Sequence, residues 1–173
     1  MDYEKLIYLV IGAFIGFITS LVKDLLIESK KNKIKNIELK RERLEELYID
    51  FSKWSNYIYS DYITLLSVMD NKLTYNQYLD LKLERKNDFD AQKIDMIIEV
   101  YINSIIPTYT LLREKLESLN MIQNEYKKDY ELYGQHDTKE VYKNGITAFL
   151  KDFTEVVDNL KKEIALEIRN SNY

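Results

Sequence analysis

Glycine and proline are scarce in this chain. Its 173 residues include only four glycines and one proline. These two residues supply most of the tight turns that join neighbouring strands, so a β-sheet protein of this length would need many more of them. Neither residue occurs between Gly16 and Met69. The sequence therefore predicts an all-α protein with a long first helix.

A long apolar run lies near the N-terminus. No residue from Leu6 to Val22 is charged, and apolar residues continue to Ile27 after one Lys-Asp pair. In a helix, 17 residues extend about 25 Å, slightly less than the ~30 Å hydrocarbon core of a bilayer, and a lysine near a helix end can reach the headgroups. We therefore predict a transmembrane anchor over residues 1–27. A buried core helix and a cleaved signal peptide remain alternatives, although the acidic start and the lack of a small-residue cleavage site disfavour a signal peptide.

Basic residues are concentrated directly after this run. Between Lys23 and Arg43 there are eight basic residues and four acidic ones. Positive charge beside a span stays cytoplasmic, so the N-terminus is predicted to lie outside and the remainder inside, with a basic juxtamembrane stalk over residues 28–43. These residues could also bind anionic headgroups, or form a solvated stretch that only sets the topology. The predicted juxtamembrane basic residues are Lys23, Lys30, Lys31, Lys33 and Lys35.

Three small residues share one face of the predicted span. Gly12, Gly16 and Ser20 follow one another at intervals of four residues. Small residues at this spacing let two membrane helices approach closely, which is a common mode of helix pairing. Dimerisation through this face is one open interpretation. The other is that the spacing arises by chance, because the motif is common in apolar segments.

Residues 28–173 read as a cytoplasmic bundle of three long helices and one short helix. Apolar residues continue at a spacing of 3 and 4 along the first helix, which should end at Met69. Thr74 and Gln77 are spaced as a capping box for a short second helix, and Asp90 can cap the third. The long helices should alternate in direction as an up-down bundle, because each has one apolar stripe.

The single proline falls within the third predicted helix. Apolar residues keep their helical spacing from Ile98 to Leu119 and pass across Pro107 without a change of phase. We therefore predict one kinked helix that continues to Tyr133, with Pro107 as its hinge and Gly134 at its end. The alternative is that Pro107 begins a new helix.

The sequence contains no recognised catalytic motif. Cysteine is absent, His136 is the only histidine, and neither a glycine-rich phosphate loop nor an H-E-x-x-H pair occurs. We therefore expect no enzymatic activity, no cofactor and no metal. From Leu44 to Tyr173 there are 16 basic and 23 acidic residues, and this negative balance disfavours nucleic acid as a partner.

Tyrosine is the unusual residue, with 15 copies. Tyr126, Tyr130 and Tyr133 are spaced to share one face of the third predicted helix, in phase with the apolar stripe before them. Tyrosine is favoured both at the wet edge of a core and at protein interfaces. Core packing is the first interpretation of this stripe, and a surface for a protein partner is the second.

These observations favour a non-enzymatic, single-pass membrane protein whose bundle binds a protein partner or a second copy of the chain. High lysine, isoleucine, asparagine and tyrosine contents are typical of AT-rich bacterial genomes, which makes the inner (plasma) membrane of a bacterium the predicted location. The alternative function is a small sensor or membrane effector, for example in phage defence, whose bundle binds a small ligand of unknown identity near Pro107.

Overall fold

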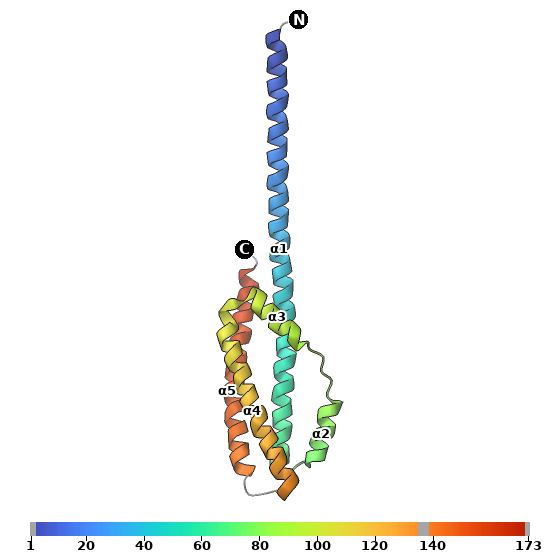
Figure 1. Ribbon diagram of the computed structural model, residues 1–173, viewed down its shortest axis with the longest axis vertical. Helices are drawn as coiled ribbons and strands as arrows, with labels where there is room; N and C mark the ends of the chain where they lie inside the picture. Colours follow the sequence, from blue (N-terminus) through green and yellow to red (C-terminus); the bar gives the residue numbers. More distant parts are fainter. Residues whose placement is uncertain (1–2, 135–138, 172–173) are drawn as a thin grey trace. The chain divides into compact units, whose positions relative to one another are not determined.

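The computed structural model describes residues 3–134 and 139–171, apart from the side chains of residues 4–13 and 15. Five α-helices and one short 3₁₀ helix account for the regular structure of the described residues, and no strand occurs among them. The prediction of an all-α protein is confirmed. The elements are α1 (Tyr3–Met69), α2 (Tyr75–Glu84), α3 (Ala91–Tyr101), η1 (Asn103–Ile105), α4 (Ile106–Tyr133) and α5 (Lys139–Asn170), as labelled in Figure 1.

The chain divides into two compact units, residues 1–41 and residues 42–173. The first unit is the N-terminal part of α1, and its described side chains are mostly exposed. Wherever side chains are described, no helix is long and apolar enough to cross a bilayer. The structure therefore does not support the predicted span, of which residues 4–13 and 15 lie outside the described side chains.

Residues 42–173 have their own core, formed by the C-terminal part of α1 together with the other helices. One cluster of buried side chains surrounds Phe51, Trp54 and Tyr109, and a second surrounds Tyr62 and Tyr126. Every residue of both clusters comes from Leu44 or later in the chain. Burial of this apolar surface is what stabilises the bundle.

The predicted alternation of helix directions is wrong for α4. Phe51 of α1 packs on Tyr109 of α4, and Tyr62, further along α1, bonds to Asn120, further along α4. The two helices therefore run parallel, whereas α5 runs antiparallel to both (Figure 1). The reason is that the connection between α1 and α4 contains α2 and α3, which together carry the chain back along the bundle.

The predicted helix ends are mostly confirmed. α1 ends at Met69, and Asn71 follows it with a positive φ of 62°. Thr74 and Gln77 form the capping box of α2, and the Asp90 side chain accepts a hydrogen bond from the backbone N–H of Lys93 at the start of α3. α4 ends at Gly134, whose φ of 71° lies in the left-handed region that favours glycine.

The predicted kinked helix through Pro107 is wrong. α3 ends at Tyr101, η1 follows, and Pro107 is the second residue of α4. A proline in the first turn has no backbone N–H to leave unsatisfied, and its fixed φ suits a helix start. The alternative reading, in which Pro107 begins a new helix, is the correct one. The apolar stripe survives the break, because Ile102 and Ile105 in the connection are themselves buried.

Two apolar residues at stripe positions of α1 do not line the core. Ile34 and Tyr48 share the helical spacing of the stripe but are exposed. Ser55, a polar residue at a position of the same stripe, is buried, and its hydroxyl donates to the backbone carbonyl of Ser52 at 3.0 Å. A buried hydroxyl bonded to its own helix adds no unsatisfied polar group to the core.

Candidate functional site

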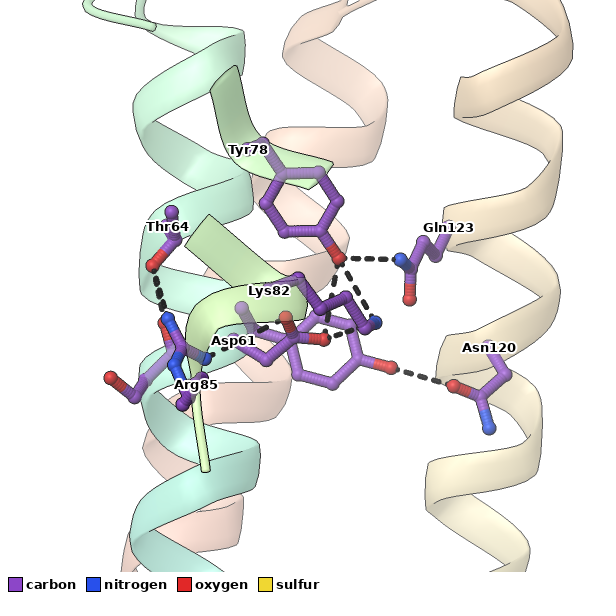
Figure 2. A network of polar contacts seen from close by, with 9 residues as sticks. Asp61, Thr64, Tyr78, Lys82, Arg85, Asn120 and Gln123 are labelled. Atoms are coloured by element: carbon purple, nitrogen blue, oxygen red, sulfur yellow. Dashed lines mark hydrogen bonds and ion pairs between the residues drawn. The ribbon is translucent and has the colours of Figure 1, made fainter. Parts of the chain in front are cut away.

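A buried carboxylate on α1 is the centre of the main polar network of the bundle. Only 7% of the Asp61 side chain is exposed. Its Oδ2 atom accepts a hydrogen bond from Lys82 Nζ at 2.7 Å and from the Tyr78 hydroxyl at 3.3 Å, and its Oδ1 atom lies 3.7 Å from Arg85 Nη1 (Figure 2). Charged side chains are rarely buried unless they are paired, and Asp61 is paired with two cations.

The three partners of Asp61 all come from α2 or its C-terminal cap. Tyr78, Lys82 and Arg85 are spaced by four and three residues, so they project from one side of this short segment. Arg85 also donates from Nη2 to the Thr64 hydroxyl at 3.0 Å and to the Ser60 carbonyl at 3.5 Å. α2 is therefore attached to α1 by a cluster of charge-assisted bonds.

The network continues to α4 through two amide side chains. Gln123 Nε2 donates to the Tyr78 hydroxyl at 2.8 Å, as Figure 2 shows. The Tyr62 hydroxyl donates to Asn120 Oδ1 at 2.9 Å. We call the set of Asp61, Tyr62, Tyr78, Lys82, Arg85, Asn120 and Gln123 the Asp61 network.

Burial keeps the two tyrosines of this network protonated. Desolvation, followed by the negative charge of Asp61, raises the pKa of Tyr78 and of Tyr62 well above the ordinary value for tyrosine. Both hydroxyls therefore act as neutral hydrogen-bond donors, and neither is a candidate base or nucleophile at neutral pH.

Two atoms of the network are not fully satisfied. Asp61 Oδ1 and Arg85 Nη1 are buried, and neither has a hydrogen-bond partner among the described residues. Their separation of 3.7 Å allows electrostatic attraction but is too long for a hydrogen bond. The C-terminal end of α2 is therefore held at Asp61 by charge without the geometry of a close Arg–carboxylate pair.

A second polar site lies between α3 and α4. Asp95 accepts hydrogen bonds from the Tyr109 hydroxyl at 2.8 Å and from Arg113 Nη1 at 2.9 Å. These three residues line a cleft of about 220 Å³ near the start of α4, together with Glu99, Glu114, Glu117 and apolar neighbours. Across the described part of the chain, no group of three or more His, Cys, Asp or Glu residues could hold a metal ion.

The structure separates the three tyrosines of the predicted partner surface. Tyr126 is buried in the core, where its ring lies 5.7 Å from that of Tyr142. Tyr130 is half-buried and packs on Tyr75 of α2 with ring centres 5.4 Å apart. Tyr133 is 66% exposed. Core packing therefore describes the first two residues, and only Tyr133 faces solvent.

The other predicted site residues lie in the first unit or outside the described residues. Gly16 and Ser20 are exposed, as are the lysines Lys23, Lys30, Lys31, Lys33 and Lys35. The surroundings of Gly12 are not described, and His136 lies outside the described residues. The roles predicted for these residues stay predictions.

Asp61, Lys82 and Arg85 were not predicted as site residues from the sequence. The spacing of Tyr78, Lys82 and Arg85 was the available signal, since it marks a polar face on a helix that also has two tyrosines to bury. Nothing in the sequence distinguished Asp61 from the 28 other acidic residues. Its role depends on the packing of α2 against α1.

Comparisons of the chain with protein-family models, with curated proteins and with solved structures gave no match. The function of the chain is therefore inferred from its own chemistry and geometry.

Proposed function

We propose that this protein is a non-enzymatic, membrane-anchored interaction protein whose helical bundle binds a protein partner or a second copy of the chain. Residues 1–27 would be the anchor, and the bundle would lie on the cytoplasmic side of a bacterial inner membrane. The observation that carries the proposal is the exposure of large apolar side chains between Phe14 and Ile27.

These side chains are too numerous and too close together to be scattered surface residues. Eight large apolar residues in this stretch are between 41% and 66% exposed, namely Phe14, Phe17, Ile18, Leu21, Val22, Leu25, Leu26 and Ile27. A contiguous exposed apolar surface marks a site that contacts a membrane or another protein. A bilayer suits it because the apolar sequence extends back to Leu6 and exposed lysines follow it.

Vesicle flotation of the full chain tests the anchor. Protein reconstituted into vesicles of phosphatidylglycerol and phosphatidylethanolamine should float with the lipid and resist extraction at alkaline pH. The double variant Leu21→Arg with Leu25→Arg should lose flotation, because two charges would enter the hydrocarbon core. Leu83→Arg is the matched control, because Leu83 is 84% exposed on α2. Wild-type protein that stays at the bottom of the gradient would refute the anchor.

Self-association is tested separately. If the small residues form a helix–helix contact in the membrane, Gly16→Leu should lower the dimer fraction, because a large side chain keeps the backbones apart. Among the described side chains, none lies within 4 Å of the position that a Cβ atom would occupy at Gly16, so the substitution does not disturb them. An unchanged mass by native mass spectrometry in mild detergent would contradict the dimer.

The second candidate function, a sensor that binds a small ligand, is favoured by the cleft between α3 and α4. This cleft lies next to Pro107, where the sequence led us to expect a ligand site. Native mass spectrometry of protein purified from its own host would test it. A reproducible small adduct that is lost on Arg113→Ala would support the sensor, and a bare protein mass would count against it.

A further inference from the structure

We infer that α2 is a releasable helix, and that the groove it fills between α1 and α4 is the docking site for a basic helix of a protein partner. This inference rests on the interaction part of the proposed function and names the surface that performs it. It does not depend on the membrane anchor, because every residue involved lies within residues 42–173.

α2 is poorly suited to remain folded by itself. It has ten residues, and isolated helices shorter than about 12–15 residues are marginal in water. Only Tyr75 and Tyr78 of this helix are buried, whereas Leu79, Leu81 and Leu83 are exposed. The helix therefore depends on the groove for its stability, and its exposed leucines add little to its attachment.

The connections of α2 allow it to leave the groove without disturbing the rest of the bundle. At its N-terminal end, residues 70–74 form a turn after α1. At its C-terminal end, residues 85–90 are non-helical, and Phe89 packs on Tyr57 of α1 with ring centres 5.5 Å apart. α2 is thus a short helix between two points that are fixed on α1, with non-helical chain on both sides.

The groove beneath α2 has the features of a helix-binding site. Tyr75 and Tyr78 of α2 belong to one buried cluster with residues of α1 and α4, among them Tyr62, Leu65, Leu119 and Tyr126, and the Tyr75 ring lies 6.4 Å from that of Tyr126. The Asp61 carboxylate lies beside this cluster, and α2 supplies two cations to it. Removal of α2 would leave a carboxylate and several aromatic rings in an open groove, which is complementary to a helix that carries aromatic and basic residues.

The geometry at Asp61 shows what the occupant needs. Oδ1 is buried with no hydrogen-bond donor among the described residues, and the guanidinium of Arg85 stops 3.7 Å away. An arginine placed closer would bind both carboxylate oxygens in the planar, bidentate geometry that this pair prefers. The chemistry therefore selects a partner helix with a tyrosine at the position of Tyr78 and an arginine within reach of both oxygens.

In this arrangement α2 is an internal competitor for the groove. A partner gains access only in the fraction of molecules from which α2 has been released, so its apparent affinity is reduced by that fraction. Weakening α2 at its own cations, without changing Asp61, should therefore strengthen binding of a helix supplied from outside.

Hydrogen exchange of the full chain tests the release of α2. In wild-type protein, backbone amides of residues 76–84 should exchange faster than those of the buried turns of α4 and α5. In the double variant Lys82→Gln with Arg85→Gln, exchange in α2 should rise at least tenfold while α4 and α5 are unchanged. The matched control is Lys86→Gln with Lys128→Gln, which removes the same charge from exposed positions. If the amides of α2 exchanged at the same rate as those of the rest of the bundle, in wild type or variant, the inference would be overturned.

A fluorescein-labelled peptide of residues 73–87 is the probe for the groove. By fluorescence anisotropy it should bind the Lys82→Gln, Arg85→Gln protein at least tenfold more tightly than wild type. Adding Asp61→Asn to that protein, or replacing Lys82 and Arg85 of the peptide by glutamine, should abolish the gain. A released variant that does not bind the peptide would refute the docking site. Peptide binding that persists when vesicle flotation fails would refute only the membrane anchor.

Discussion

Replacing Asp61 by asparagine is the most direct test of how the bundle holds α2. Asparagine has nearly the same shape as aspartate, and its carbonyl oxygen can still accept the hydrogen bond from Tyr78. The substitution therefore removes the charge and little else. What is lost is the attraction of the carboxylate for Lys82 at 2.7 Å and for Arg85 at 3.7 Å.

The size of the effect follows from burial. Removing one member of a fully buried ion pair costs about 3–5 kcal/mol, because the remaining charge is left without a partner. Here the Lys82 side chain is 33% exposed and that of Arg85 is 22% exposed, so both cations can be partly hydrated after the change. We therefore expect the free energy of unfolding to fall by about 2 kcal/mol, or ~4–8 °C in the melting temperature for a chain of this size.

Urea unfolding in mild detergent, followed by tryptophan fluorescence, measures this change. Trp54 is the only tryptophan, and it lies in the core with its ring 5.4 Å from that of Phe51. Asp152→Asn is the matched control: this exposed carboxylate lies 3.7 Å from Lys115, and such pairs contribute about 0–1 kcal/mol. Equal effects for Asp61→Asn and Asp152→Asn would refute the reasoning.

Three further predictions concern the core, the proline and the tyrosines. Phe51→Ala should lower the free energy of unfolding by about 3–5 kcal/mol in urea titrations, because Phe51 is fully buried, whereas Leu83→Ala on exposed α2 should change it by less than about 0.5 kcal/mol. Pro107→Ala should cost only about 0.4–1 kcal/mol and leave the circular dichroism unchanged, since the proline begins α4; a large loss of helicity would indicate a hinge instead. Burial raises the pKa of Tyr126 to about 12, and a hydrogen bond to Asp129 does the same for Tyr142. Unfolded tyrosines ionise near pH 10, so stability should fall as pH rises from 10 to 12; an unchanged urea midpoint over that range would contradict this.

The all-α fold class and several helix ends could be predicted because they depend on local chemistry. The capping box at Thr74, the cap at Asp90 and the positive φ of Gly134 each depend on a few neighbouring residues. All the residues that form each of these caps lie close together in the sequence, so the sequence is enough to predict them. Most of the core could be predicted for a similar reason, since one apolar stripe per helix requires only the helical period.

Pro107 shows where periodicity misleads. The stripe from Ile98 to Leu119 keeps its phase, and unbroken phase favoured one continuous helix. In the structure a 3₁₀ turn follows α3, and Ile102 and Ile105 remain buried across the break. A short connection can preserve the phase of a stripe because the same core selects apolar residues on both sides of it.

The Asp61 network could not be predicted because its members meet only after α2 packs on α1 and α4. Asp61 is 21 residues from Lys82, and Tyr78 is 45 residues from Gln123. On α1, Asp61 directly precedes the core residue Tyr62, a position that is usually exposed on a helix with one buried stripe. It is buried because a further helix covers that side of α1, which the stripe of α1 alone does not reveal.

The two units place different physical demands on the chain. All described core residues lie from Leu44 onward, so burial within the bundle stabilises residues 42–173 and leaves the side chains from Phe14 to Ile27 exposed. Transfer of that apolar surface out of water would be worth on the order of 10 kcal/mol, which is comparable to the stability of a whole domain. A bilayer or a second copy of the chain could supply this free energy. The groove under α2 makes the opposite demand, because α2 must be attached weakly enough for the groove to open. Substitutions at Leu21 and Leu25 should therefore alter membrane attachment without changing exchange in α2, and substitutions at Lys82 and Arg85 should do the reverse.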